Sequence, residues 1–290
     1  MRSDAGAGSR AGRVGDRLKR GLPPDAVPGA ATTVDAFLGG QIEIEQPARG
    51  YRAGRDAVLL AAAAQPVRSN SGPLRVVDVG AGVGTAGLCL AARLDEADVT
   101  LVERDLLASQ LSDRNIERNR LAARARVVTV DVMKPAPEAV KQSLADASFD
   151  LAISNPPYLA EGRHRPSADE LKAAAHAMPE DGLDRWLRFM ARLTRPGGTA
   201  VIIHRADCLE PLLAALNGRF GGVVVLPLHP RAGEPASRVI VRAVKASRAP
   251  LRIAQGLVLH DDDGAFRPDI KAVLSAPRAL DWPVPGQAPG

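Results

Sequence analysis

The sequence predicts an α/β fold in which helices cover both faces of a mostly parallel sheet. From residue 74 onward, short runs rich in Val, Ile and Leu alternate with helical stretches, and this alternation is typical of βαβ units. One apolar run, residues 149–154, stops abruptly at Asn155, Pro156, Pro157 and Tyr158. Open α/β sheets bind their ligands at the carboxyl ends of strands, so this corner marks a candidate site.

Composition limits the possibilities. The 290 residues are 46% hydrophobic but only 3% aromatic, so we expect one substantial core built from Ala, Val and Leu. The net charge of +5 is compatible with a nucleic-acid partner but does not require one. Cys89 and Cys208 give neither a zinc pattern nor a disulfide framework, which favours buried thiols and a cytoplasmic location.

The beginning of the chain carries no recognisable targeting or membrane signal. We expect no signal peptide, because the N-terminus lacks an apolar segment, and the longest apolar run, residues 57–64, is too short to cross a bilayer. Residues 1–30 are rich in Gly, Ala, Pro and Arg and predict a disordered basic arm. This arm either adds affinity for phosphates or is a translated upstream stretch; a transit peptide is a third reading, which its two acids disfavour.

Two short strands are expected around Gly39 and Gly40, before the main alternation begins. A glycine-flanked loop, residues 50–56, then leads into a helix over 57–65. Asp56 stands where it can cap this helix. The spacing leaves open whether the loop covers a ligand or only enters the domain.

A glycine cluster follows the first strand of the main alternation. The strand is expected over residues 74–79 and a helix over 85–93, with glycines between them at Gly80, Gly82 and Gly84. Glycines let the backbone approach a ligand at a helix N-terminus. The spacing of Gly82, Gly84 and Gly87 matches a dinucleotide fingerprint, which is a weak signal alone. A purely structural tight turn is the alternative.

Three successive predicted strands end with an acid. After the first strand come strands over 99–102 and 126–130, with a helix over 105–121 between them. The acids at the strand ends are Asp78, Glu103 and Asp131. Glu103 stands where an acid holds ribose hydroxyls in a βαβ unit, so the three acids predict a pocket for a nucleoside-type ligand.

The corner on the fourth strand suits an amino group. Two prolines cannot extend a central strand, because each lacks the backbone N–H and has a fixed φ. Asn155 offers a side-chain carbonyl, and the Asn155–Pro156 backbone offers a second one. Two acceptors suit a planar –NH₂ group, and the ring of Tyr158 suits the flat group that carries it. The alternative is a strand-ending turn that happens to hold an aromatic residue.

Both motifs resemble those of a known family. Residues 78–84, Asp-Val-Gly-Ala-Gly-Val-Gly, resemble the first motif of class I S-adenosylmethionine-dependent methyltransferases. The Asn-Pro-Pro-Tyr corner resembles the fourth motif of those that methylate amino groups. Further segments are similar to the valine-tRNA adenine-N6 methyltransferase family in its α-proteobacterial form, and these are residues 35–40, 50–60, 195–198, 230–235 and 257–260.

This resemblance implies a Rossmann-like class I methyltransferase with a seven-stranded sheet whose last strand is antiparallel. It implies S-adenosylmethionine as cofactor, no metal, and an RNA substrate, with tRNA the most direct expectation. Asn155, Pro156, Pro157 and Tyr158 would be catalytic. Glu103 would hold the cofactor ribose and Asp131 its adenine amine. The methionine end would lie on the turn that follows Asp78, at Gly80, Gly82 and Gly84.

The remaining segments complete the expected domain, residues 31–246. Residues 159–179 border the target pocket and are a candidate for substrate recognition, with a surface loop as the alternative. Residues 181–193 predict an amphipathic helix with Trp186 in the core. A strand over 199–204, a helix that Asp207 caps, and an antiparallel strand pair follow. Residues 247–290 predict a small extension with a strand near 257, a turn at 261–264, a helix at 268–275 and a disordered end.

Other functions fit parts of the pattern. A protein glutamine amide is also a planar –NH₂ group, although enzymes of that type carry a larger helical domain before the first motif. Guanine N2 methylation is a further alternative, and so is an RNA-binding module of the same fold that performs no chemistry. An NAD-dependent oxidoreductase fits the glycine fingerprint but leaves the Asn-Pro-Pro-Tyr corner unexplained.

Overall fold

The computed structural model describes residues 31–50, 52–66, 72–135, 137–157, 178–179 and 181–282. Residues 31–290 form one compact unit. The predicted basic arm, Tyr158 and nearly all of the predicted recognition segment 159–179 lie outside the described residues. Within the described part of the chain, no helix is long and apolar enough to cross a membrane.

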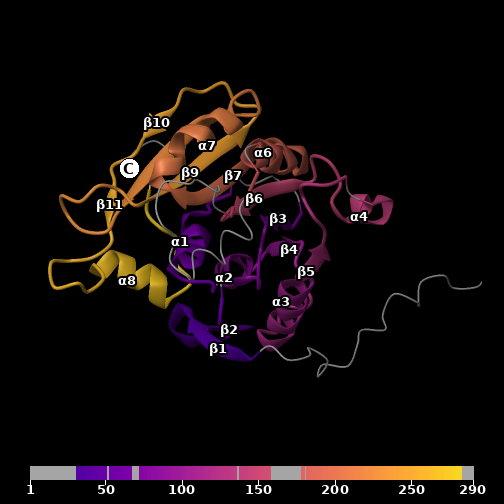
Figure 1. Ribbon diagram of the computed structural model, residues 1–290, viewed down its shortest axis with the longest axis horizontal. Coiled ribbons are helices and arrows are strands. Elements are labelled where there is room, and N and C mark those ends of the chain that lie inside the picture. The colour runs from indigo at the N-terminus through magenta and orange to yellow at the C-terminus, as the bar shows by residue number, and fades with distance from the viewer. Residues whose placement is uncertain are drawn as a thin grey trace, which may run out of the picture. The chain divides into compact units, whose positions relative to one another are not determined.

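The main sheet confirms the predicted α/β fold (Figure 1). Its strand order is β10-β8-β9-β7-β6-β3-β4-β5, with β11 also paired to β8. Only β9 runs antiparallel to its neighbours, β7 and β8. The seven principal strands are β3 (Leu74–Val79), β4 (Ala97–Glu103), β5 (Ala125–Thr129), β6 (Phe149–Ser154), β7 (Thr194–Arg205), β8 (Phe220–His229) and β9 (Arg238–Lys245). Two short strands, β10 (Arg252–Ile253) and β11 (Leu257–Val258), extend the sheet beyond the predicted seven.

Helices cover both faces of this sheet (Figure 1). One face packs against α1 (Arg55–Ala63), α2 (Thr85–Arg93), α3 (Leu106–Arg118) and α8 (Pro268–Ser275). The other face packs against α6 (Gly182–Leu193) and α7 (Leu209–Leu216), with α4 (Glu138–Ser143) and the 3₁₀ turn η2 (Ala206–Cys208) between strands. The predicted antiparallel last strand and the predicted helix at 85–93 are both confirmed.

The buried residues are mainly Ala, Val, Leu and Ile, as the composition predicts. In α6 the apolar residues recur at helical spacing and are buried, including Trp186, which is 6% exposed. Its predicted place in the core is therefore confirmed. Neither cysteine forms a disulfide; Cys89 is buried as predicted, but Cys208 is only half-buried, so the prediction of two buried thiols is wrong for Cys208. Burial raises the pKa of the Cys89 thiol to about 12, so this thiol stays protonated and unreactive.

Two predicted helix caps are wrong. Asp56 lies in the first turn of α1, whose N-cap is Gly54, and its carboxylate instead accepts a bond from Arg238 Nε at 2.9 Å. Asp207 lies inside η2, and its carboxylate accepts from Arg205. In both cases an arginine offers a charge-assisted bond that outcompetes the backbone N–H groups of a helix N-terminus.

Strand β7 begins earlier than its predicted start at residue 199. Phe149 pairs with Thr194, and the next paired residues are Leu151 and Thr199. Residues 195–198 therefore form a bulge on β7. This bulge contains Gly197 and Gly198, and Gly197 has a φ of +76°.

The N-terminal strands form a separate two-stranded sheet. β1 (Thr32–Phe37) and β2 (Ile42–Pro47) pair antiparallel around a 3₁₀ turn, η1 (Leu38–Gly40). Glu45, on β2, accepts hydrogen bonds from Arg114 at 2.8 Å and Arg118 at 3.3 Å, both on α3. The hairpin is thereby attached to the helix that follows β4.

The C-terminal segment returns to the beginning of the unit. Leu280 N–H donates to Ala62 O at 2.8 Å, and Trp282 Nε1 donates to Ala63 O at 3.1 Å. Trp282 is buried, and α8 packs against α1. The predicted helix at 268–275 and the predicted turn at 261–264 are confirmed.

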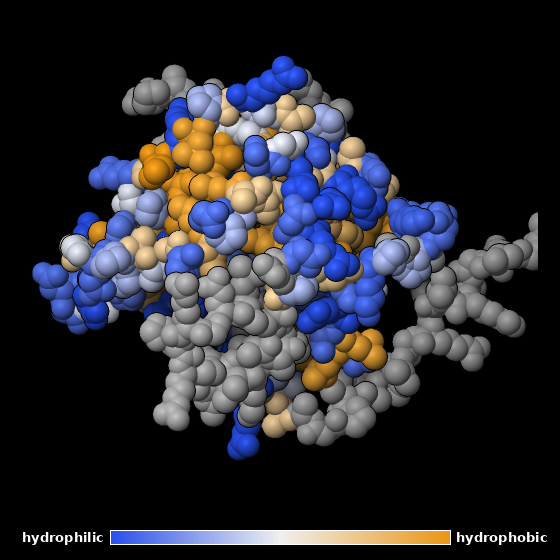
Figure 2. Space-filling model, turned by 45° about the horizontal axis from the view of Figure 1, so that its top comes forward, coloured by the Kyte–Doolittle hydropathy of each residue, from blue (hydrophilic) through white to orange (hydrophobic). Residues whose placement is uncertain are grey.

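The surface is mostly hydrophilic on the face shown in Figure 2, with an apolar patch at its upper left, the region of α7 and β10 in Figure 1. Among the described residues of this region, Leu251 is 47% exposed and Ile253 is 70% exposed. Ile253 belongs to β10, an outer strand of the main sheet, and Leu251 comes just before this strand, so both lie away from the strand ends that carry the predicted site.

Candidate active site

The predicted site residues other than Tyr158, which lies outside the described residues, gather at the carboxyl ends of neighbouring strands of the main sheet. β3 pairs in parallel with β4 on one side and β6 on the other. Asp78 lies opposite Ile153, so Gly80 and Asn155, each two residues further on, come level at the carboxyl ends of adjacent strands. Neighbouring strands are about 4.8 Å apart. The glycine turn and the Asn-Pro-Pro corner therefore lie side by side.

The glycine turn begins by bending over β4. The N–H groups of Gly80 and Ala81 both donate to Val102 O, at 2.8 and 3.0 Å. Gly80 has a φ of +74°, and a Cβ there would lie 2.6 Å from the Trp186 ring. Both the conformation and the contact exclude any side chain at this position.

The third glycine of the fingerprint serves helix packing. A Cβ at Gly87 would lie 2.3 Å from the Leu101 side chain on β4, so only glycine lets α2 approach the sheet this closely. Its N–H donates to Asp78 Oδ2 at 2.9 Å. The fingerprint thus joins the turn, the helix and the acid that precedes them.

Asp78 is buried with an unusual proton affinity. Its side chain is 2% exposed, and burial raises the pKa of its carboxyl to about 7, with a smaller contribution from Glu103. The bond from Gly87 opposes this rise. Among the described residues, no cation pairs with Asp78, so a positively charged ligand group nearby would favour its ionised form.

Glu103 is fixed by backbone N–H groups. Oε2 accepts from Gly82 N–H at 2.8 Å. Oε1 accepts from the N–H groups of Arg104 and Asp105, both at 2.8 Å. A carboxylate has about four lone-pair positions, so Glu103 can still accept from a ligand hydroxyl while its own orientation is held.

Asp131 follows β5, the next strand along the same edge. Oδ1 accepts from Met133 N–H at 3.0 Å, and the exposed Lys134 lies 3.5 Å from Oδ2. Since Glu103 pairs with Thr129, Asp131 comes just beyond Glu103 in the direction of the strand ends. The order along the edge is the one that the sequence predicts.

The corner after β6 rests on a buried polar pair. Trp186 Nε1 donates to Ser154 Oγ at 3.0 Å, and Ser154 Oγ donates to Val79 O at 2.7 Å. Asn155 is half-buried and Pro156 is buried. Directly behind Asn155, β6 is therefore bonded both to β3 and to α6.

Sequence reasoning missed two buried polar groups on α3 that hold the glycine turn. Ser112 Oγ donates to Gly82 O at 2.8 Å, and Asn115 Nδ2 donates to Val83 O at 3.0 Å. Both residues are 0% exposed. Their spacing of three residues, which places them on one face of a helix, is the signal that could have found them.

The chemistry of this edge fits S-adenosylmethionine. Asp78 and Glu103 bond only to backbone N–H groups among the described residues, so their negative charge is available to a cationic ligand. An anionic pyrophosphate beside these carboxylates would be repelled, which disfavours the dinucleotide reading of the glycine cluster. The described residues hold no group of three or more His, Cys, Asp or Glu side chains placed to bind a metal ion.

Comparison with known proteins agrees with this geometry. The family model for the methyltransferase small domain matches residues 58–185. The chain is 29% identical over 241 residues to a tRNA1(Val) (adenine(37)-N6)-methyltransferase of Porphyromonas gingivalis, covering 81% of this chain and 91% of the relative. It is 29% identical over 236 residues to a protein of the same name from an Enterobacter species, covering 74% and 90%.

A solved structure is similar over nearly its whole length. It is a crystal structure from Agrobacterium tumefaciens described as a predicted O-methyltransferase. The two chains are 32% identical and superpose with a TM-score of 0.63, covering 77% of this chain and 97% of the other.

Proposed function

The chain belongs to the S-adenosylmethionine-dependent methyltransferases, and we propose that it methylates the N6 amine of an adenine in tRNA. The observation that carries this proposal is the position of Asn155, level with the glycine turn and backed by the Ser154–Trp186 bond. The names of the curated relatives support tRNA and single out adenine 37 of a valine tRNA. Such a substrate would be met in the cytoplasm.

The corner would orient the amine. An aromatic amine is a weak nucleophile, because its lone pair is delocalised into the ring. The Asn155 side-chain carbonyl and the Asn155–Pro156 backbone carbonyl would each accept one N–H. Both bonds favour a tetrahedral nitrogen whose lone pair points away from the ring. Holding that lone pair in line with the methyl donor would supply most of the rate enhancement.

The target base would have to leave its stack to reach this corner. Tyr158, which lies outside the described residues, would stack on the flat face of the base. Pro156 and Pro157 would keep the corner rigid, since each has a fixed φ. After methylation the nitrogen is cationic, and one of its N–H protons passes to water, so no strong general base is required.

Bound S-adenosylmethionine supplies a methyl group made electrophilic by its sulfonium. Glu103 would accept from the ribose hydroxyls, and Asp131 would accept from the adenine amine. Asp78 and the turn formed by Gly80, Gly82 and Gly84 would hold the methionine end. The catalytic domain would comprise residues 31–246, with 247–290 as an extension that packs against α1.

Separate measurements of binding and catalysis on one variant test this proposal. Asn155→Ala should lower methyl transfer to total tRNA at least about 100-fold, because the amine loses an oriented acceptor. The Kd for S-adenosylmethionine, measured by titration calorimetry, should change less than about threefold. Asn217→Ala, at the exposed C-terminal end of α7, serves as the matched control and should match the unsubstituted protein in both measurements.

Product analysis separates the competing functions. Mass spectrometry of nucleosides from treated tRNA should show N6-methyladenosine. A methyl group on ribose oxygen or on guanine N2, or transfer to a protein glutamine, would contradict the proposed target atom. Binding of cofactor and RNA without any transfer would identify a non-catalytic RNA-binding module.

A further inference from the structure

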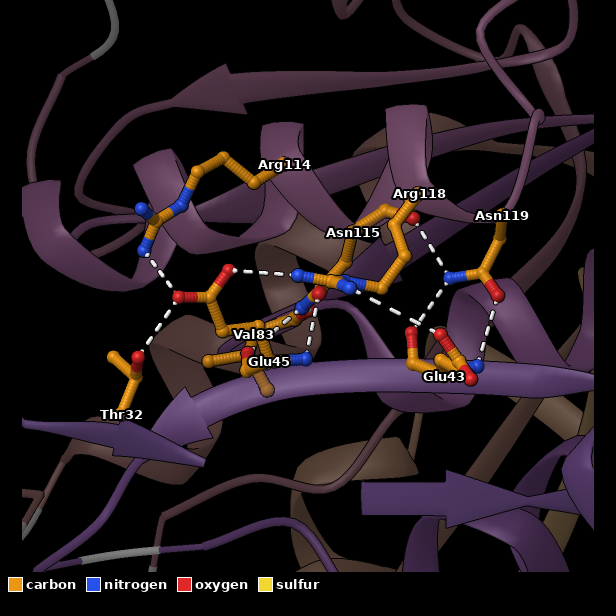
Figure 3. Close-up of polar contacts among 8 residues, drawn as sticks. All are labelled: Thr32, Glu43, Glu45, Val83, Arg114, Asn115, Arg118 and Asn119. Atoms are coloured by element: carbon orange, nitrogen blue, oxygen red, sulfur yellow. Dashed lines mark hydrogen bonds and ion pairs between the residues drawn. The ribbon is translucent and has the colours of Figure 1, made fainter. Parts of the chain in front are cut away.

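Asn115 joins three separate segments of the chain. It belongs to α3, and its side chain is 0% exposed. Oδ1 accepts from Glu45 N–H at 2.7 Å, while Nδ2 donates to Glu45 O at 2.9 Å and to Val83 O at 3.0 Å (Figure 3). One buried amide therefore bonds both to the N-terminal hairpin and to the glycine turn.

One helical turn later, Asn119 makes the same contact with the hairpin. Its Oδ1 accepts from Glu43 N–H at 2.9 Å, and its Nδ2 donates to Glu43 O at 2.7 Å (Figure 3). Four residues of helix rise about 6 Å, and two residues of strand span about 6.8 Å. The two amides therefore match the backbone repeat of β2 and pair with its outer edge as a neighbouring strand would.

The glycine turn receives a second bond from the same helix face. Ser112 Oγ donates to Gly82 O at 2.8 Å, so the carbonyls of two consecutive turn residues are held from α3. On its other side the turn is held by the bond from Gly82 N–H to Glu103. The Asn115 bond to Val83 is the contact that links this arrangement to the hairpin.

We propose that Asn115 is a positioning residue for the cofactor, which couples docking of the β1–β2 hairpin to the geometry of the glycine turn. When the hairpin is docked, Glu45 satisfies one side of the amide and leaves its second N–H directed at Val83 O. When the hairpin separates, the amide is free to turn toward other partners, and the turn loses a fixed carbonyl. The coupling is reciprocal, so cofactor binding should in turn stabilise the docked hairpin.

This inference rests on S-adenosylmethionine as the cofactor and not on the RNA substrate, so binding without RNA tests it. Asn115→Ala should raise the Kd for S-adenosylmethionine about 10-fold, since it removes bonds to both segments. Asn119→Ala is the matched control, because Asn119 bonds to the hairpin and to its own helix but not to the turn. Its Kd should change less than about twofold. Ser112→Ala removes a turn contact without touching the hairpin and should give an intermediate Kd.

Hydrogen exchange on the unsubstituted protein tests the coupling even if Asn115→Ala does not fold. Adding S-adenosylmethionine should slow exchange of the Glu45 amide together with the amides of residues 82–84. Slowing at the turn alone would overturn the inference, as would equal Kd values for Asn115→Ala and Asn119→Ala. An unsubstituted chain that bound no S-adenosylmethionine would overturn the cofactor assignment as well, so the two failures are distinguishable.

Discussion

Buried acids at the amino ends and at the carboxyl ends of the strands in the main sheet have different partners. At the amino ends, Asp150 on β6 is 5% exposed, and its carboxylate accepts from Arg195 Nε at 2.6 Å and from Arg75 N–H at 2.9 Å. At the carboxyl ends, the Asp78 side chain is 2% exposed, but among the described residues it bonds to no cation. Removing one partner of a buried ion pair costs stability because the other charge is left uncompensated, whereas a buried acid without a cation is costly to ionise until a cationic ligand lies beside it. The carboxyl ends of the strands thus leave a buried acid available to the cationic cofactor that we propose, whereas the acid at the amino ends is paired within the protein.

The largest expected effect comes from breaking the pair at the amino edge. Asp150→Ala leaves Arg195 beside an apolar side chain and should lower the free energy of unfolding by about 3 kcal/mol. Urea denaturation measures this loss. Cofactor affinity should not change, because the pair lies at the amino ends of the strands and the glycine turn lies at their carboxyl ends. Asp98→Ala breaks a half-exposed pair with Arg126 and should cost less than about 1 kcal/mol. Equal losses in the two variants would contradict the distinction between buried and exposed pairs.

A substitution at Glu103, at the carboxyl end of β4, should affect cofactor binding more than the free energy of unfolding. Glu103→Gln keeps one acceptor oxygen but removes the charge and places an NH₂ group among backbone N–H donors. We expect the Kd for S-adenosylmethionine to rise about 30-fold, measured by titration calorimetry. The free energy of unfolding should fall by about 1 kcal/mol. A variant with an unchanged Kd would show that Glu103 has only a structural role.

The pKa of Asp78 predicts a pH dependence of both binding and stability. Because this pKa is raised to about 7, the native protein retains a proton that the unfolded chain releases near pH 4. The stability contributed by this proton is complete below about pH 4 and is lost as the pH rises through 7. Cofactor affinity should follow the opposite trend and increase about five- to tenfold between pH 6 and 7.5, as the carboxyl ionises.

Asp78→Asn removes this titration while keeping an acceptor for Gly87 N–H. The cofactor titrates as well, so the informative quantity is the difference between the pH profiles of the two proteins. The variant should bind more weakly at pH 7.5 and lose the Asp78 contribution to the slope. Parallel profiles would show that ionisation of Asp78 is not linked to binding.

The smallest expected effect is a change in the free energy of unfolding on substitution of a buried arginine. Arg242, on β9, is 0% exposed, and its guanidinium nitrogens have no hydrogen-bond partner among the residues that the structure describes. Burial lowers its pKa to about 10, so it remains charged at neutral pH. Arg242→Met should fill the same volume and raise the free energy of unfolding by about 1 kcal/mol in urea. Arg238→Met, four residues earlier on the same strand, removes the partner of Asp56 and should give no such gain. A less stable Arg242→Met protein would show that the cation is compensated in the folded state.

The sequence predicted the elements of the site better than the contacts between them. Local patterns of apolar residues and glycines, each contained in a single short segment, predict the strand ends near Asp78 and Glu103 and the helix at 85–93. The cap at Asp207 was mispredicted although its partner, Arg205, is only two residues away in the sequence. The partner of Asp56 was mispredicted because a local cap competes with an arginine that only the folded chain brings close. Arg238 is 182 residues from Asp56.

The hydrogen bonds that support the site could not be predicted from the sequence, because their partners come from other elements. Ser154 in an apolar strand and Asn115 in a helix are ordinary residues for those elements. Their function depends on Trp186 and on Val83, which come from other elements and approach only in the folded sheet. Polar residues at positions that a periodic pattern marks as buried are the sequence signal worth following.

The bonds at the end of α1 have a consequence for synthesis. The last carbonyl groups of this early helix are satisfied by Arg93, by Leu280 N–H and by the Trp282 indole. A helix end without such partners is costly when it is buried. On the ribosome, the end of α1 therefore has incomplete bonding until residues 280–282 have been translated, and a chain terminated before residue 280 would leave these carbonyl groups without those partners.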